Sequence, residues 1–247
     1  MSRLISYAQN GEDVRLWRAF TGVELPASGH FTYVDVGANH PVELSITASL
    51  YSLGWRGVLV EADPDFAAEL RRHRLGDHVV EMAAGDRAGE ITFYRVAGTG
   101  LGTLSEVEAR AAGAAGFGVS EFTVATATLN HIVESTLGLD SPIHFMSIDV
   151  EGAEPLVLEG LNLDVVRPWV VCIEAIDADT KIPNHTAWES RLLEHNYIDA
   201  AFDGINRWYV AGEHADLAES IAVPLNPIDA GKYGWISSTS ESREQLS

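Results

Sequence analysis

Short strand-like runs rich in valine and isoleucine alternate with helix-like patterns along most of this 247-residue chain, from about residue 31 onward. Strands are expected at 31–36, 57–60, 78–83, 89–96, 143–149 and 169–176, and helices at 45–53, 64–74 and 153–160. Strands that alternate with helices of this length are typical of a parallel sheet covered by helices on both faces. The sequence therefore predicts a doubly wound, Rossmann-like α/β domain.

Two stretches depart from this alternation. Residues 197–202 and 207–210 are strand-like and flank Asp203-Gly204, a pair that favours hairpin turns, so we expect a closing antiparallel hairpin. The stretch 97–122 is rich in glycine and alanine, which predicts a lid or an insertion.

Acidic side chains far outnumber basic ones. The chain has 36 Asp and Glu against 16 Lys and Arg, which gives a formal charge of −20 at pH 7. Proteins that bind duplexes or anionic membranes use Lys and Arg to neutralise phosphates, so this balance argues against both kinds of partner. The hydrophobic fraction of 46% is close to the globular average and argues against disorder of the whole chain.

The chain ends and the single cysteine carry no signal for export. Residues 1–7 lack the charged start and apolar stretch of a signal peptide, and no apolar stretch is long enough to span a membrane. Cys172 lies in an apolar run and is interpreted as a core residue. We expect a cytoplasmic protein with one domain at 1–223, which begins with a helical segment, and a polar tail at 224–247.

Acidic residues stand at the carboxyl ends of several predicted strands. They are Asp35 and Glu61 after the first two strands, Asp86 after the third, and Asp149 and Glu174 in the last two. Ligands of doubly wound proteins bind at these strand ends, and a carboxylate after the second strand holds ribose hydroxyls in nucleoside sites. Each acid alone can be explained as a helix N-terminal carboxylate, but several in succession favour a nucleoside site.

The turn after the first strand indicates which kind of nucleoside. A dinucleotide needs a Gly-x-Gly-x-x-Gly turn for its pyrophosphate, whereas residues 35–41 read Asp-Val-Gly-Ala-Asn-His-Pro, with Gly37 as the one glycine. Gly37 lets the backbone approach a ligand closely. A nucleoside without phosphates and with a cationic sulfonium suits an acidic loop better, and S-adenosylmethionine is that molecule.

Longer motifs occur in a fixed order between Ser6 and about Val210. They are Ser-Tyr-Ala-Gln-Asn-Gly-Glu-Asp at 6–13, Tyr-Val-Asp-Val-Gly-Ala-Asn-His-Pro at 33–41, Gly-Trp-Arg-Gly at 54–57, Val-Glu at 60–61, Ser-Ile-Asp-Val-Glu-Gly-Ala-Glu at 147–154, Asn-His-Thr-Ala-Trp-Glu at 184–189 and Phe-Asp-Gly-Ile-Asn-Arg-Trp-Tyr at 202–209. Through these motifs nearly the whole chain resembles the FkbM-type methyltransferases. The Asp-x-Gly turn is common among Rossmann-like enzymes, whereas the motifs at 54–57 and 147–154 are specific.

The resemblance implies a class I methyltransferase fold and transfer of a methyl group from S-adenosylmethionine to an oxygen. It implies cofactor contacts by Asp35, Gly37, Ala38 and Asn39 around the methionine part, Glu61 at the ribose, Ala83, Ala84 and Asp86 at the adenine edge, and Gln9 and Glu12 over the cofactor. Many class I enzymes have further glycines where this chain has Asn39 and Pro41, which weakens the cofactor motif without removing it.

Methyl transfer to an alcohol requires in-line alignment and a base that takes the hydroxyl proton. Asp149 is the first candidate, because this fold places the end of its strand opposite the transferred methyl, and Glu174 and His185 are further catalytic candidates. Structural interpretations stay open: a contact to the methionine amino group for Asp149, a buried network for Glu174 and a helix cap for His185. Asp149 and Glu174 also offer oxygen ligands that suit Mg²⁺, so a metal-assisted route is an alternative that lacks a third clear ligand.

The acceptor site is expected to include Trp188, Asp203, Asn206 and Arg207. Aromatic faces beside Asp, Asn and Arg suit sugar rings, although core packing and turn formation explain the same residues equally well. The resemblance implies an acceptor hydroxyl on a glycosyl unit or natural product, with the glycine-rich stretch 97–118 acting as a lid.

Two other functions fit the same fold. An NAD-type oxidoreductase would share the ribose carboxylate but lacks its glycine motif here. A non-catalytic module that binds a sugar or a partner protein would keep the fold without turnover. Methylation of nucleic acid is disfavoured by the charge of −20, and the sequence does not indicate an oligomeric state.

Overall fold

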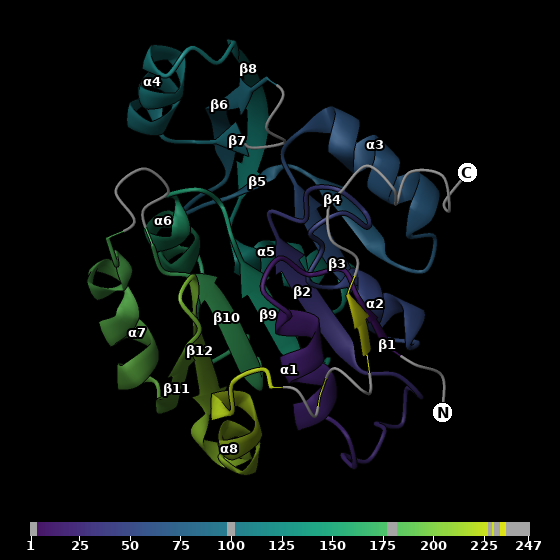
Figure 1. Cartoon of the computed structure of the whole chain (residues 1–247). Coiled ribbons are helices and arrows are strands. Elements are labelled where there is room, and N and C mark those ends of the chain that lie inside the picture. Colours follow the sequence, from purple (N-terminus) through teal and green to yellow (C-terminus); the bar gives the residue numbers. More distant parts are fainter. Residues whose placement is uncertain (1–3, 98–101, 177–181, 227–228, 230–232, 236–247) are drawn as a thin grey trace.

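The large sheet of the computed structural model carries the acidic strand ends (Figure 1). The structure describes residues 4–97, 102–176, 182–226, 229 and 233–235. In spatial order the seven strands of this sheet are β11 (Tyr197–Phe202), β12 (Asn206–Ala211), β10 (Val170–Glu174), β9 (Phe145–Ile148), β2 (Thr32–Val36), β3 (Arg56–Glu61) and β4 (His78–Glu81).

The strand order reverses between β2 and β9. From β2 the chain proceeds outward to β4, and it then returns to β9 and proceeds outward in the other direction. Neighbouring strands from β10 to β4 are parallel, whereas β12 runs antiparallel to both β10 and β11. The doubly wound prediction and the closing hairpin are therefore confirmed, and the reversal creates a crevice for ligands at the carboxyl ends of β2 and β9.

Helices cover both faces of this sheet (Figure 1). One face packs against α1 (Glu12–Ala19), α2 (Ala48–Ser52), α3 (Pro64–His73) and α8 (Asp216–Ala222), and the other against α5 (Leu129–Thr136), α6 (Glu154–Glu159) and α7 (Glu189–Glu194). Successive side chains of a strand point to opposite faces. Val58 and Val60 of β3 therefore enter the core that contains α5, whereas Leu59 enters the core that contains α3.

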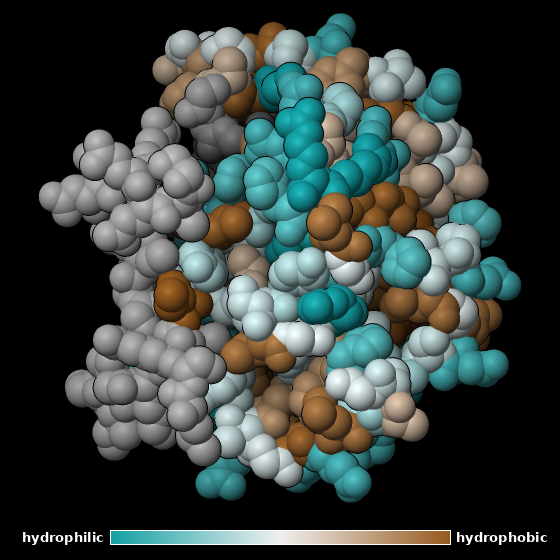
Figure 2. Space-filling model, turned by 90° about the vertical axis from the view of Figure 1, so that its right-hand side faces the viewer, coloured by the Kyte–Doolittle hydropathy of each residue, from teal (hydrophilic) through white to brown (hydrophobic). Residues whose placement is uncertain are grey.

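The start of α3 shows how local sequence fixes an element beside the crevice. Asp63 caps the helix by accepting the backbone N–H of Asp65, and Pro64 occupies the first turn, where a missing N–H costs nothing. The helix buries Ala67 and Leu70. Figure 2 shows hydrophilic side chains gathered on the upper part of the molecular face that carries α3, as expected for an amphipathic surface helix.

A second sheet lies above the carboxyl ends of the large one (Figure 1). Its order is β5 (Ala83–Ala84), β8 (Val119–Ala127), β6 (Gly89–Val96) and β7 (Gly102–Thr103), and α4 (Glu106–Ala114) packs on it. The single strand predicted at 78–83 is wrong, because β4 ends at Glu81 and the backbone N–H of Met82 turns back to the Val80 carbonyl. The next two residues then pair with β8 instead.

The predicted insertion at 97–122 forms β7, α4 and the first part of β8 in the second sheet. Residues 98–101, within its glycine-rich start, lie outside the described residues.

The N-terminal segment forms a separate strand pair with a segment near the other end of the chain. In this pair β1 (Leu4–Ser6) runs parallel to β13 (Tyr233–Trp235).

The segment predicted as a polar tail from residue 224 therefore contains a strand that pairs with the N-terminal segment. Besides the β1–β13 pairing, Asp229 forms an ion pair with Arg18 of α1 at 3.1 Å. Strand pairing gives backbone N–H and C=O groups their hydrogen-bond partners, and a polar composition does not reveal such pairing. The end of the tail, 236–247, lies outside the described residues. None of the helices in the described part of the chain is both long and apolar enough to cross a membrane.

Candidate active site

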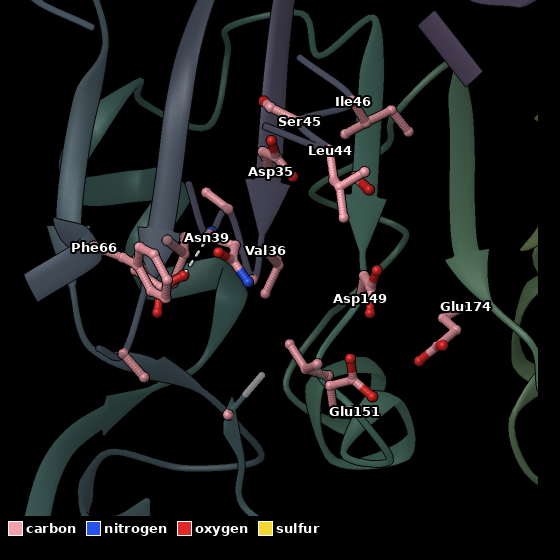
Figure 3. A pocket seen from close by; sticks show the side chains of 18 of the residues that line it. Asp35, Val36, Asn39, Leu44, Ser45, Ile46, Phe66, Asp149, Glu151 and Glu174 are labelled. Carbon is pink, nitrogen blue, oxygen red and sulfur yellow. Dashed lines mark hydrogen bonds between the residues drawn. The ribbon is translucent and has the colours of Figure 1, made fainter. Parts of the chain in front are cut away.

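A cavity of about 780 Å³ opens at the carboxyl ends of β2, β3, β9 and β10 (Figure 3). Its volume falls within the range of small-molecule sites, about 300–1,000 Å³. Many of the residues predicted from sequence line it together: Gln9, Glu12, Asp35, Gly37, Ala38, Asn39, Glu61, Ala83, Ala84, Asp149, Glu174 and Asn206. The topology thus collects residues that are scattered over most of the chain.

The turn after β2 needs glycine at position 37. Gly37 has a φ of 82°, and a Cβ built there would lie 1.8 Å from the Asp149 carbonyl oxygen. No side chain fits this contact, so Gly37 brings the ends of β2 and β9 together. The N–H groups of Gly37 and Ala38 both donate to the Val60 carbonyl of β3, which ties the same turn to the third strand end.

The Glu61 carboxylate is held by backbone donors. One oxygen accepts the N–H of Asn39 and the other accepts the N–H of Asp63, each at 2.7 Å. Asn39 has a φ of 52°, a left-handed conformation that asparagine adopts more readily than most residues. Burial raises the pKa of Glu61 to about 7, although both backbone hydrogen bonds oppose the shift.

Asp35 lies nearby and is also buried. Its carboxylate accepts a hydrogen bond from the Thr47 hydroxyl at 2.7 Å, and burial raises its pKa to about 6. Asp35 and Glu61 thus place two carboxyl groups on the same side of the cavity, each poised to ionise near neutral pH.

A second group of acids lies at the ends of β9 and β10. Figure 3 shows Asp149, Glu151 and Glu174 around the same part of the cavity. The carboxyl groups of Asp149 and Glu174 are hydrogen-bonded to each other, so one of them must carry a proton. Burial raises the pKa of both, that of Glu174 to about 10, and the hydrogen bond favours a protonated Glu174 and an ionised Asp149.

The loop after β9 is strained where it borders the cavity. Glu151 has a φ of 51°, which is unusual for a residue with a side chain. The Thr103 hydroxyl of β7 donates to the Glu151 carbonyl at 2.7 Å. The second sheet therefore supports the conformation of the acidic loop.

The N-terminal segment and the closing hairpin form another wall. The Asn206 amide donates to the buried Glu12 carboxyl group at 2.9 Å, and burial raises the pKa of Glu12 to about 7. The Asn10 side chain donates to the Asp203 carbonyl at 3.2 Å. Asn206, which was expected at the acceptor site, thus lies on this wall beside Glu12.

Sequence reasoning missed several apolar residues around Ala83 and Ala84. Phe66 of α3, Phe93 of β6 and Leu104 after β7 line this part of the cavity. The second sheet is fastened here by Arg95 of β6, which hydrogen-bonds through two nitrogens to the carboxylate of Asp63. No local motif marks these apolar residues, because their role depends on how the second sheet folds over the first.

Three predicted residues lie away from the cavity lining. Asp86 is on the surface and pairs with the neighbouring Arg87 at 3.0 Å. His185 precedes α7 and lies 3.9 Å from Glu189, one turn further along the chain. Trp188 is buried in the hydrophobic core beside α7, as the structural interpretation of this residue anticipated.

Two further residues expected at the acceptor site serve the closing hairpin. The Asp203 carboxylate accepts the backbone N–H of Asn206 at 2.8 Å and the indole N–H of Trp208 at 2.7 Å, which fixes the turn. Arg207 pairs with Asp199 across the hairpin at 2.6 Å. Successive side chains of a strand point to opposite faces, so Asn206 of β12 lines the cavity whereas its neighbour Arg207 lies on the other side of the strand.

The described residues contain no group of three His, Cys, Asp or Glu side chains arranged to hold a metal ion. Asp149 and Glu174 share a hydrogen bond in the position where the Mg²⁺ alternative requires two ligands. Within the described part of the chain the Mg²⁺ alternative therefore still lacks a third ligand, and it stays a prediction.

The reversed strand order, the antiparallel β12 and the acidic cavity define a Rossmann-like methyltransferase fold. The chain belongs to the methyltransferase FkbM domain family, whose model matches residues 35–198 and confirms the resemblance carried by the motifs. The matched range excludes the motifs at 6–13 and 202–209, although both contribute residues to the cavity.

Solved methyltransferase structures resemble this chain distantly. Methyltransferase FkbM from Methylobacillus flagellatus KT is 15% identical with a TM-score of 0.40, and the match covers 68% of this chain and 38% of that one. Precorrin-6y C5,15-methyltransferase from Geobacter metallireducens GS-15 is 15% identical with a TM-score of 0.38, and the match covers 78% of each chain. The chain thus spans well under half the length of the first protein. No curated protein matches the sequence.

Proposed function

We propose that this methyltransferase transfers a methyl group from S-adenosylmethionine to a hydroxyl oxygen of a sugar, a glycosyl unit or a related natural product. One observation carries the proposal: the cavity holds two different kinds of carboxyl group. Asp35 and Glu61 flank the turn after β2, and the Asp149–Glu174 pair stands at the ends of β9 and β10. The first kind suits binding of a cation and a ribose, and the second suits movement of a proton.

The cavity fits this cofactor by charge and by chemistry. S-adenosylmethionine supplies an electrophilic methyl carbon on a cationic sulfonium, and surrounding carboxylates favour such a cation. Glu61 stands at the end of β3, where doubly wound folds hold ribose hydroxyls. Phe66 and Phe93 offer apolar ring surfaces for a purine close to Ala84.

Asp149 is the proposed base. When bound, the cofactor would supply the methyl group, and the Asp149 carboxylate would take the proton that the acceptor hydroxyl loses. Glu174 acts as a positioning residue, because its proton orients Asp149 through their hydrogen bond. A positioned base typically contributes about 10²–10⁴-fold to the rate.

The charges of the cavity support an acceptor without negative groups. Its acidic lining residues are Glu12, Asp35, Glu43, Glu61, Asp63, Asp149, Glu151 and Glu174, and no Lys or Arg lines it within the described part of the chain. A phosphate or carboxylate on the acceptor would meet these acidic side chains without a Lys or Arg of the described lining to pair with it. Neutral hydroxyl-rich molecules avoid this repulsion, which supports a sugar-like acceptor.

The proposed lid is the stretch 97–118, and its described residues include β7 of the second sheet and α4. Phe93, Gly102 and Leu104 line the cavity from this sheet, so its position suits exclusion of water during transfer.

Calorimetric titration with S-adenosylmethionine, with NAD as a parallel control, tests the proposed cofactor. We expect binding of the sulfonium compound alone. Mass spectrometry of neutral glycans incubated with enzyme and cofactor should then show an added methyl group, and phosphorylated sugars should not be modified. Binding of NAD alone, or of neither compound, would overturn the proposal.

A further inference from the structure

A charged side chain is buried behind the cavity, at the end of α3. Arg74 directly follows that helix and is 3% exposed, and it does not line the cavity. Arginine is almost never buried to this extent unless its charge and its N–H groups have partners. The partners of Arg74 therefore indicate what the buried charge serves.

The first partner is a carboxylate that is buried as well. Arg74 Nε donates to the Asp77 carboxylate at 3.0 Å, and a terminal nitrogen of the guanidinium donates to the Tyr33 hydroxyl at 2.7 Å. The Tyr33 hydroxyl in turn donates to Asp77 at 2.6 Å, and the backbone N–H of Gly57 also donates to Asp77, at 2.9 Å. These contacts explain how the arginine is held, and its other contacts lead toward the cavity.

The other contacts of the guanidinium hold the segment between the turn after β2 and the start of α2. Arg74 donates to the Pro41 carbonyl at 3.2 Å and to the Thr47 carbonyl at 3.4 Å. The nitrogen that contacts the Tyr33 hydroxyl also lies 3.1 Å from the Thr47 hydroxyl oxygen. Both ends of the segment 41–47, which lines part of the cavity, are therefore attached to one side chain.

Thr47 connects the arginine to Asp35 in the cavity wall. A guanidinium has donors only, so the Thr47 hydroxyl must accept from Arg74. Its one hydrogen is then left for the Asp35 carboxylate, which lies at 2.7 Å. A carboxyl group that accepts such a bond is favoured in its ionised form. The direction of donation is thus fixed from Arg74 through Thr47 to Asp35, and all three side chains are buried.

The acids near Asp35 show why a positive charge is needed there. Burial raises the pKa of Asp35 to about 6, whereas the Thr47 hydrogen bond and the charge of Arg74 oppose the increase. A protonated Asp35 would be neutral and would not attract the cation of S-adenosylmethionine. Arg74 is the basic member of the charged groups that act on Asp35, which are Arg74, Asp77, Glu61 and Asp149 within the described part of the chain.

We propose that Arg74 is a positioning residue of the methyltransferase site, which orients the Asp35 carboxylate through the Thr47 hydroxyl and supplies a positive charge against the surrounding acids. This inference rests on the proposed function, in which Asp35 faces the cation of S-adenosylmethionine. Neither Arg74 nor Thr47 lines the cavity, so both act through contacts made behind its wall.

Thr47→Val breaks this link with little disturbance, because it keeps the shape of the side chain and leaves the pair of Arg74 and Asp77 in place. NMR titration of the Asp35 carboxyl carbon, in the protein without cofactor, should show a midpoint about one pH unit higher than in the parent. Thr47→Ser keeps the hydroxyl and should titrate as the parent does. Thr136→Val is the matched control, since the Thr136 hydroxyl donates to the Ile132 carbonyl within α5 and does not line the cavity. It should leave the Asp35 midpoint unchanged.

Calorimetry with S-adenosylmethionine extends the test to the site. With an Asp35 midpoint of about 6 in the parent and about one unit higher in Thr47→Val, the variant should bind about threefold more weakly at pH 6.5 and approach the parent at pH 8.5. Comparison with the parent at each pH cancels the titration of Glu12 and Glu61, which both proteins share. A loss of affinity from distorted structure alone would not disappear as the pH rises.

Arg74→Gln removes the charge together with the link, so its Asp35 midpoint should lie above that of Thr47→Val. This variant also leaves Asp77 without its partner, and if it does not fold, the two Thr47 variants decide the question. An unchanged midpoint in Thr47→Val, or an affinity ratio that does not vary with pH, would overturn the inference, and binding by the parent would leave the proposed function standing. If the parent does not bind S-adenosylmethionine, both fail.

Discussion

Two walls of the cavity use the same type of side chain in different ways. The β2–β3 wall contains Asp35 and Glu61, and the β9–β10 wall contains Asp149 and Glu174. Backbone N–H groups donate to the Glu61 carboxylate, whereas Asp149 and Glu174 are hydrogen-bonded to each other. A carboxyl group with built-in donors ionises more readily than one whose partner is another acid, so the walls suit ligand binding and proton transfer respectively.

The largest effect is expected on the β9–β10 wall. Asp149→Asn removes the proposed base while keeping the size of the side chain, so turnover should fall by about 10²–10⁴-fold with cofactor affinity retained. Steady-state methyl transfer and calorimetry with S-adenosylhomocysteine measure the two quantities. Asp164→Asn, at an exposed aspartate, is the control and should match the parent. Parent-like turnover in Asp149→Asn would remove Asp149 from the proton-transfer role.

The next effect concerns the contact that joins the walls. Gly37→Ala places a Cβ against the Asp149 carbonyl, in addition to the penalty for a positive φ. Gly29→Ala is a matched control, because Gly29 has a similar φ of 78° and open space around its Cβ position, so it should cost only about 1–2 kcal/mol. Urea unfolding should give a clearly larger loss of stability for Gly37→Ala. Equal losses would mean that the two strand ends adjust independently.

On the β2–β3 wall, Glu61→Ala should weaken binding of S-adenosylhomocysteine by at least about tenfold, since hydrogen bonds to charged groups contribute about 1.5–3 kcal/mol. Glu81→Ala, at the end of the neighbouring β4, is the control and should bind like the parent. Unchanged affinity in Glu61→Ala would separate this wall from the cofactor.

The last effect is a pH dependence that belongs to the β9–β10 wall. The pKa of Glu174 is about 10 in the folded protein and ordinarily 4.5, so the folded state keeps a proton that the unfolded state releases. Stability should therefore fall as pH rises through 7.5 to 9, by up to about 1.4 kcal/mol per pH unit for one proton. Glu61, with a pKa of about 7, has lost most of its proton before this window.

Glu174→Gln should flatten that slope, because the amide does not titrate. Urea unfolding at pH 7.5 and pH 9 measures the slope in each protein, and Glu81→Gln serves as the control at an exposed strand end. The same slope in Glu174→Gln and the parent would show that the carboxyl pair does not retain a proton in this range.

Much of the fold follows from patterns that act locally. The alternation of strands and helices predicted the doubly wound sheet, and Asp63 with Pro64 marked the start of α3. The prediction failed at Glu81, where β4 ends, and it did not include the pairing of β13 with β1 in the segment after residue 224. Both features concern pairing between distant segments, which no local pattern records.

The sequence by itself determined the family, the acidic strand ends and the glycine turn, because each is a short motif whose chemistry is fixed by residue type and spacing. Only the tertiary structure decided that Asp149 and Glu174 share a hydrogen bond, that Asn206 faces the cavity while Arg207 does not, and that the Thr47 hydroxyl links Arg74 to Asp35. These properties depend on burial and on contacts between residues far apart in the chain, and such contacts form only when the sheet and its covering elements pack together.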